Sequence, residues 1–158
     1  MDLKRKLELM KKYDFQDFGN IRGSIEFDMA ILRWGCNPEK AETTLSGIEE
    51  SLKQMQQQYG CINFTEILAE IGDEDKEDFA TLFRTREVLP KLHTAVQNFV
   101  AFVKNKNYKV SAEDETYRKL DDTLTEIKDA DSHQGCRYRA RIRSLENHLN
   151  KSEPARAI

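Results

Sequence analysis

The chain has few helix breakers and no long apolar run. Its 158 residues include seven Gly and three Pro, too few for the frequent turns that a β-sheet protein needs. No apolar segment approaches the roughly 20 residues that a membrane-spanning helix requires. Charged residues make up 34% of the chain and hydrophobic residues 39%. This composition favours long, solvated helices, and we expect an all-α protein.

Cysteine and net charge are also low, and each low value excludes a class of protein. The three cysteines, Cys36, Cys61 and Cys136, are odd in number and far apart, which argues against a disulfide scaffold and favours a reducing cytoplasm. A protein delivered into a host cell by another secretion route would show the same cysteine pattern. The formal charge of −3 is too small for a general attraction to nucleic acid or acidic membranes. The first residues alternate charge with leucine, unlike a signal peptide or an anchor.

The sequence lacks the spacings that mark metal and cofactor sites. No pair of Cys or His residues matches a zinc or di-iron ligand set. Asp73, Asp75 and Glu77 resemble the start of a calcium loop, but Asp78 stands where that loop needs Gly and Arg84 where it needs Glu. We therefore expect no metal site and no cofactor.

The middle of the chain has a strict heptad pattern. Its apolar positions are Leu82, Leu89, Val96 and Val103, and Pro90 lies inside the repeat without changing its phase. This pattern predicts one kinked helix or two nearly collinear ones joined at Pro90. A self-assembling helical scaffold is one hypothesis for such a stripe, and it requires the stripe to be exposed in the monomer.

A second helix is expected to begin after Ser24, following an irregular packed loop over residues 15–23. Phe27, Ile31 and Trp34 recur at helical spacing and are expected to face the core. Further on, Asn37 followed by Pro38 has the form of a helix start.

The last third of the chain divides by charge. Residues 111–136 hold eight acidic and three basic side chains, whereas residues 137–158 hold six basic and two acidic ones. Both parts carry apolar residues at helical spacing, which predicts an acidic helix folded back on a basic helix, with pairing between some of their charges. The complete expectation is an antiparallel bundle of six or seven helices, closed by this hairpin. Residues 1–150 form its single domain and residues 151–158 a frayed tail.

Two charged regions are candidate partner-binding surfaces. The first combines the outward acidic side chains of the acidic helix with the arginine row of the basic one. These residues are Asp122, Glu126, Asp129, Arg137, Arg139, Arg141 and Arg143. The second is the acidic turn, of which Asp73, Glu74, Asp75 and Asp78 are the candidate binding residues.

These surfaces favour a small cytoplasmic protein-interaction module, such as an inhibitor, an adaptor or an immunity-type factor. Interfacial charge tunes association rate and partner choice, so unpaired surface charges suit such a role. The partner would be another protein, a basic one that handles nucleic acid included, and homodimerisation is compatible with this role. We expect neither direct nucleic-acid binding nor a membrane partner. The sequence favours a non-enzymatic role without deciding it.

Arg143 and His148 provide an alternative. Their Arg-x4-His spacing resembles the signature of HEPN-type ribonucleases, which are small helical bundles. The resemblance covers six residues, and Ser144 departs from the polar Asn, Asp or His that commonly follows the Arg in that family. It implies a metal-independent ribonuclease in which His148 acts as general acid or base and Arg143 stabilises phosphate charge, usually across a dimer.

Overall fold

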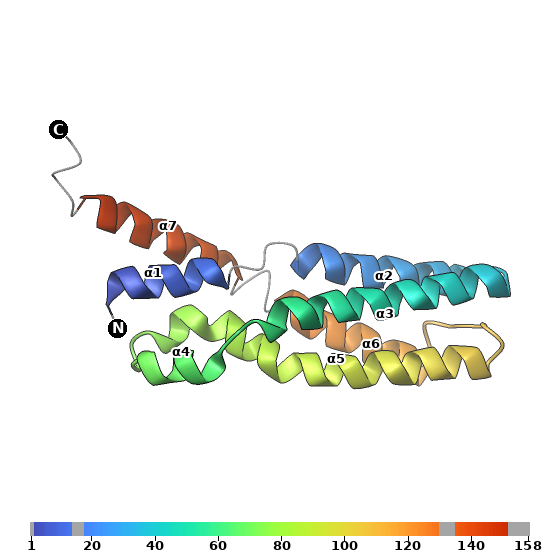
Figure 1. Cartoon of the computed structure of the whole chain (residues 1–158). Coiled ribbons are helices and arrows are strands. Elements are labelled where there is room, and N and C mark those ends of the chain that lie inside the picture. Colours follow the sequence, from blue (N-terminus) through green and yellow to red (C-terminus); the bar gives the residue numbers. More distant parts are fainter. Residues whose placement is uncertain (1, 14–17, 130–134, 152–158) are drawn as a thin grey trace.

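The computed structural model describes residues 2–13, 18–129 and 135–151 (Figure 1). Its elements are α1 (Leu3–Lys12), α2 (Phe18–Trp34), α3 (Pro38–Gly60), α4 (Phe64–Glu70), the 3-10 turn η1 (Lys76–Phe79), α5 (Ala80–Asn105), α6 (Glu115–Asp129) and α7 (Gly135–Lys151). The described residues contain seven α-helices and no strand. The prediction of an all-α fold is therefore confirmed.

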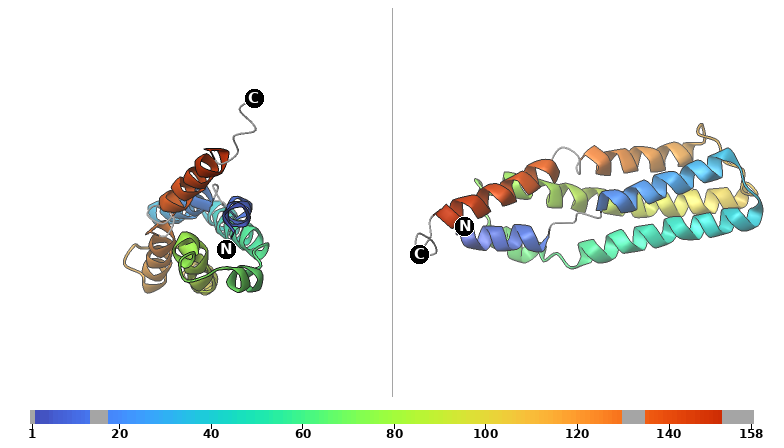
Figure 2. Two further views of the ribbon diagram at one scale, coloured as in Figure 1. Left: turned by 90° about the vertical axis from the view of Figure 1, so that its left-hand side faces the viewer. Right: turned by 90° about the horizontal axis from the view of Figure 1, so that it is seen from above.

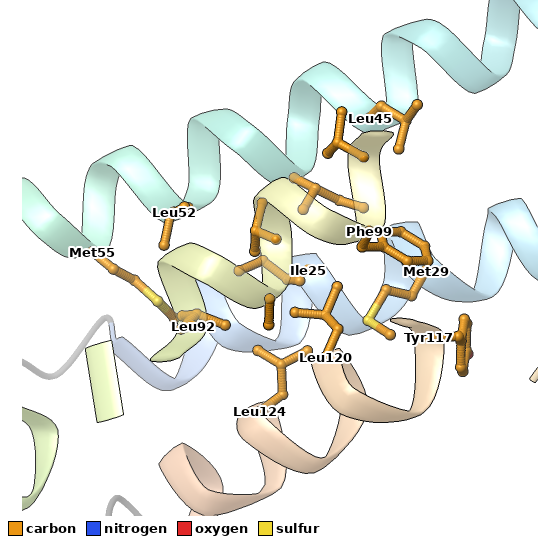
Figure 3. Packing of buried hydrophobic residues seen from close by; sticks show 14 of the residues in the cluster. Ile25, Met29, Leu45, Leu52, Met55, Leu92, Phe99, Tyr117, Leu120 and Leu124 are labelled. Carbon is orange, nitrogen blue, oxygen red and sulfur yellow. The ribbon is translucent and has the colours of Figure 1, made fainter. Parts of the chain in front are cut away.

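Four long helices, α2, α3, α5 and α6, form a bundle that occupies one part of the molecule (Figures 1 and 2). In Figure 1, α2 runs from left to right and α3 runs back from right to left. α5 then runs from left to right, and α6 runs back. Their apolar side chains meet in one cluster, in which Ile25, Met29, Leu92, Phe99 and Leu120 interdigitate (Figure 3). Burial of these large side chains provides the main driving force for the bundle.

The heptad stripe of α5 is buried. Leu89, Val96 and Val103 lie in this cluster, and Leu82 lies in the second apolar cluster described below. Leu82, Leu89, Val96 and Val103 are between 0% and 5% exposed. A scaffold assembled through this stripe needs it exposed, so that hypothesis is wrong.

α5 is one continuous helix, although Pro90 lies near its middle. Proline has no N–H, so the carbonyl of Arg86, four residues before it, lacks its usual helical donor. Both residues are on the exposed side of α5, where water can satisfy that carbonyl. Of the two sequence-based alternatives, the structure selects a single helix.

A second apolar cluster lies at the other end of the molecule. We call it the end cluster, and it gathers α1, α4, η1, α7 and the first turn of α5. Its buried members are Leu9, Met10, Tyr13, Ile62, Ile67, Phe79, Leu82, Tyr138, Ile142 and Leu145. The buried hydroxyl of Tyr138 donates a hydrogen bond of 2.6 Å to the carbonyl of Met10, which ties α7 to the end of α1.

The C-terminal helices do not form the expected acidic and basic hairpin. α6 packs against α5 and α2, whereas α7 packs beside α1 and against η1. Figure 2 shows α6 and α7 in different parts of the molecule. The apolar stripe of α7, Tyr138, Ile142 and Leu145, finds its partners in the end cluster. Apolar packing thus outweighed the weak attraction between two solvated, oppositely charged helices.

The orientation of α2 also differs from the expectation. α2 begins at Phe18, and its buried residues are Phe18, Ile25, Met29 and Leu32. Phe27 and Trp34 are 61% and 70% exposed. The prediction chose the more aromatic face, but the face with flexible and branched aliphatic side chains packs against α3 and α6. Residues 152–158 of the predicted tail lie outside the described residues, and Lys151 is the last residue of α7.

Candidate interaction surface

The outward face of α6 carries two adjacent carboxylates, those of Asp121 and Asp122. Both side chains are exposed, and neither has an ion-pair partner among residues 2–13, 18–129 and 135–151. α6 turns this face outward because Tyr117, Leu120 and Leu124 on its opposite side are buried in the bundle. The sequence prediction that Asp122 faces solvent is confirmed, and Asp121 was not among the predicted site residues.

Two open grooves flank this face of α6. One lies toward the C-terminal end of α2 and is lined by Arg33, Arg118, Asp121 and Asp122, together with neighbouring residues. The other lies against α5, and Asp122 lines it as well. A partner side chain could therefore approach Asp122 from either side.

Glu126 does not belong to this outward face. Its carboxylate points toward α5, where the nitrogen atoms of Arg84 and Lys91 lie 3.9 and 3.8 Å from Oε2. The sequence placed Glu126 outward, and this placement is wrong because the cations of α5 draw the side chain across the helix edge. The side chain of Asp129, the third acid predicted for this surface, lies outside the described residues.

The arginine row of α7 is divided between solvent and internal contacts. Arg137 and Arg143 are exposed, and Arg139 is half-buried. The Nε atom of Arg141 lies 3.3 Å from Oδ2 of Asp78 in η1. Since α7 lies in the end cluster, this row and the acids of α6 are two separate surfaces and not one combined face.

The acidic turn is divided in the same way. Asp73 and Glu74 are exposed, and Asp73 forms a 3.2 Å ion pair with Lys76. Asp75 and Asp78 point inward, where both accept hydrogen bonds from the ammonium group of Lys6. The N···O distance from Lys6 to Asp75 is 2.8 Å. Two of the four predicted binding residues of this turn therefore hold α1 in place.

Lys6 is the centre of a buried ionic cluster formed by Lys6, Asp75, Asp78 and Arg141. The Lys6 side chain is 3% exposed, against 14% for Asp75 and 21% for Asp78. Burial alone lowers the pKa of Lys6, but hydrogen bonds from Lys6 to the two carboxylates outweigh it and raise that pKa above its ordinary value. The hydrogen bond from Lys6 holds the pKa of Asp75 below its usual range. The pKa shifts of Lys6 and Asp75 both favour the charged form of the group at neutral pH.

Sequence reasoning missed this cluster, although one signal was present. Lys6 lies three residues after Leu3 and four before Met10, which places it on the apolar face of α1. A lysine there needs buried partners of opposite charge. The distance along the chain between Lys6 and Asp75 hides these partners from any local pattern.

Arg143 and His148 do not converge within one chain. Both are exposed on α7, and their spacing separates them by about 140° around the helix axis. A shared site would need a second subunit. The ribonuclease alternative therefore stays a prediction without support from the geometry of the single chain.

Comparisons with family models, curated proteins and solved structures give no match to this chain. Among the described residues, no three His, Cys, Asp or Glu side chains gather as a metal site would require. None of the described helices is both long enough and apolar enough to cross a bilayer.

Proposed function

We propose that the protein is a helical interaction module whose α6 face binds a basic surface of a partner protein. In this role it would act as an inhibitor, an adaptor or an immunity-type factor. The observation that carries the proposal is the pair of exposed carboxylates of Asp121 and Asp122, which have no ion-pair partner in the described part of the chain. Charges left uncompensated on a folded surface raise association rates with an oppositely charged partner.

These carboxylates lie on a rigid surface of this protein, and a rigid surface favours specific recognition of a partner. They project from a helix whose other side is fixed in the bundle by Leu120 and Leu124, both 0% exposed. Aspartate has a short side chain, so binding freezes little rotamer freedom. The grooves on either side of Asp122 leave room for long basic side chains.

A cytoplasmic location forms part of the same proposal. The thiols of Cys36 and Cys61 are free, and Cys61 is exposed. Free exposed thiols suit a reducing compartment, because an oxidising one tends to pair them.

Charge reversal with a matched control tests the proposed face. The test variant is Asp121→Lys/Asp122→Lys, and the control is Glu49→Lys/Glu50→Lys, which reverses two adjacent exposed acids on α3. Both variants change the net charge of the chain equally. Each tagged protein is used to capture partners from the native cell. The capture is done at low salt, because exposed charges are least screened there.

We expect the α6 variant to lose the captured partner and the α3 variant to retain it. A partner that both variants retain would show that Asp121 and Asp122 are not the binding face. Equal loss from both variants would indicate general attraction between opposite charges, which also contradicts the proposal.

A further inference from the structure

The face of α2 that turns away from the core is free of ionisable side chains. Seven residues at helical spacing form it, and we call them the α2 stripe. They are Asn20, Gly23, Ser24, Phe27, Ala30, Ile31 and Trp34, all exposed or half-buried. In the view from above in Figure 2, α2 lies nearest the viewer among the four bundle helices, between α3 and α6. An uncharged stripe is unexpected on the surface of a chain in which 34% of the residues are charged.

The two large aromatic side chains of the stripe are held out to solvent. Phe27 is 61% exposed and Trp34, the last residue of the helix, is 70% exposed. Two charged residues of α2 that lie outside the stripe, Arg22 and Glu26, form a 2.9 Å ion pair and so compensate each other's charge. Exposed aromatic residues on an uncharged surface are typical of interaction sites.

Apart from Ala30, the stripe residues that follow Phe27 have larger side chains than those that precede it. The N-terminal part carries the small residues Gly23 and Ser24, and the C-terminal part carries the large residues Ile31 and Trp34. The positions are symmetric about Phe27. If two copies of α2 pack antiparallel around a two-fold axis at Phe27, Trp34 meets Asn20, Ile31 meets Gly23, and Ala30 meets Ser24. The large side chains of Trp34 and Ile31 then fall opposite the smaller Asn20 and Gly23, and Phe27 meets its own copy on the axis.

We propose that the α2 stripe is the interface of a homodimer, with a second copy of this chain packed antiparallel against it. A fully buried Phe or Trp covers roughly 150–250 Å². Phe27 and Trp34 are already partly covered in the monomer, so the four aromatic side chains of two copies would bury a further area of about 500 Å². The remaining residues bring the total toward the roughly 1,200 Å² at which stable interfaces begin. An interface of this size is typical of a weak, reversible association. The dimer is independent of the α6 face.

Two measurements on the full chain test this interface. Sedimentation velocity between about 1 µM and 1 mM reports the monomer–dimer equilibrium. Trp34 is the only tryptophan of the chain, so its fluorescence reports this position alone. We expect the sedimentation coefficient to rise with concentration and the Trp34 emission to shift to shorter wavelength over the same range, because dimerisation removes the indole from water.

Substitutions in the stripe locate the contact. Trp34→Ser removes the largest side chain from both halves and is expected to weaken dimerisation on the order of 100-fold. A Cβ atom added at Gly23 meets nothing within 4 Å in the monomer, so Gly23→Leu should fold normally. It would collide with Ile31 of the second copy and weaken dimerisation at least about tenfold. Gly23→Leu/Ile31→Ala exchanges the bulk across the interface and is expected to restore the dimer.

Leu68 provides the matched control, because it is a large apolar residue on α4 that is 50% exposed. Leu68→Ser should leave dimerisation unchanged, and so should Asp121→Lys/Asp122→Lys. A wild-type chain that stays monomeric at the highest concentration would overturn the proposal. A dimer that neither Trp34→Ser nor Gly23→Leu weakens would do the same.

Discussion

The bundle and the end cluster are held together by different means. In the bundle, long regular apolar stripes pack against one another, and few ion pairs join distant parts of the chain. In the end cluster, three cations of α1 form ion pairs with other segments: Lys6 with Asp75 and Asp78, Arg5 with Glu66 and Glu70, and Lys11 with Glu146 at 2.9 Å. α1, α4 and η1 are short and each offers little apolar area, so ion pairs add to apolar packing in the end cluster.

The bundle should respond most strongly to loss of an apolar side chain. Phe99 is fully buried and packs edge-to-face on Tyr117 with ring centroids 6.0 Å apart. Phe99→Ala is expected to lower the free energy of unfolding by about 4 kcal/mol. The loss should be equal at low and high salt in urea denaturation. Phe27→Ala, at an exposed position, is the control and should have little effect; a comparable loss there would contradict the assignment of faces.

The end cluster should respond most to loss of its buried cation. Lys6→Met leaves Asp75 and Asp78 without their ammonium partner and should lower the free energy of unfolding by about 3 kcal/mol. Hydrogen exchange should show α1 and α7 losing protection before α3 and α6. Lys4→Met on the exposed side of α1 is the control. Equal protection loss across both regions would mean that they unfold as one unit.

The contribution of the Lys6 cluster to stability should vanish at both ends of the pH scale. The folded pKa of Asp75 lies below its ordinary 3.8, so its contribution is present above that pH and is lost as pH falls through the folded pKa. The folded pKa of Lys6 lies above 10.5, so its contribution is present below that pH and is lost as pH rises. The stability difference between wild type and Lys6→Met should therefore narrow in strong acid and in strong base. A constant difference would rule out the ionic account.

A smaller effect is expected from the hydrogen bond that joins α7 to α1. Tyr138→Phe removes the hydroxyl that donates to the Met10 carbonyl at 2.6 Å. Both groups are buried, so the expected loss is about 1 kcal/mol in thermal or urea unfolding. Tyr108→Phe removes an equally short but exposed hydrogen bond to Glu42 at the far end of the bundle. No measurable change is expected there, because water replaces the lost partner.

The smallest effect concerns Gly47 in α3. A Cβ at this position would lie 2.9 Å from Oδ2 of Asp28 in α2, so glycine allows the close approach. Gly47→Ala should gain about 1 kcal/mol of helix propensity when Asp28 is also Ala, and less when the carboxylate must move. A double-mutant cycle in urea measures this coupling. Equal gains in both backgrounds would show that the carboxylate moves freely.

The parts of the fold that local signals determine could be predicted from the sequence. The Asn37 side chain accepts a hydrogen bond of 2.7 Å from the N–H of Lys40, as its position before Pro38 indicated. The heptad positions of α5 are buried as their spacing required. In both cases the determining residues are neighbours along the chain.

The errors concern contacts between distant segments. Whether α7 pairs with α6 or with α1 depends on the fit of two whole surfaces, which no short pattern encodes. The prediction of the candidate site was wrong for the same reason. Asp75 and Asp78 could be recognised as acidic, but the sequence did not show that they are the partners of Lys6. In α2, two faces were apolar, and composition alone could not decide which one the bundle would bury.

The proline within α5 has a mechanical consequence. α5 is shared by both regions, since Leu82 belongs to the end cluster and Val88 onward to the bundle. Pro90 lies just beyond this boundary, and the helical hydrogen bond to Arg86 is already missing there. Bending α5 at this turn therefore costs one backbone hydrogen bond less than bending it elsewhere, so a change in angle between the end cluster and the bundle meets least resistance at Pro90.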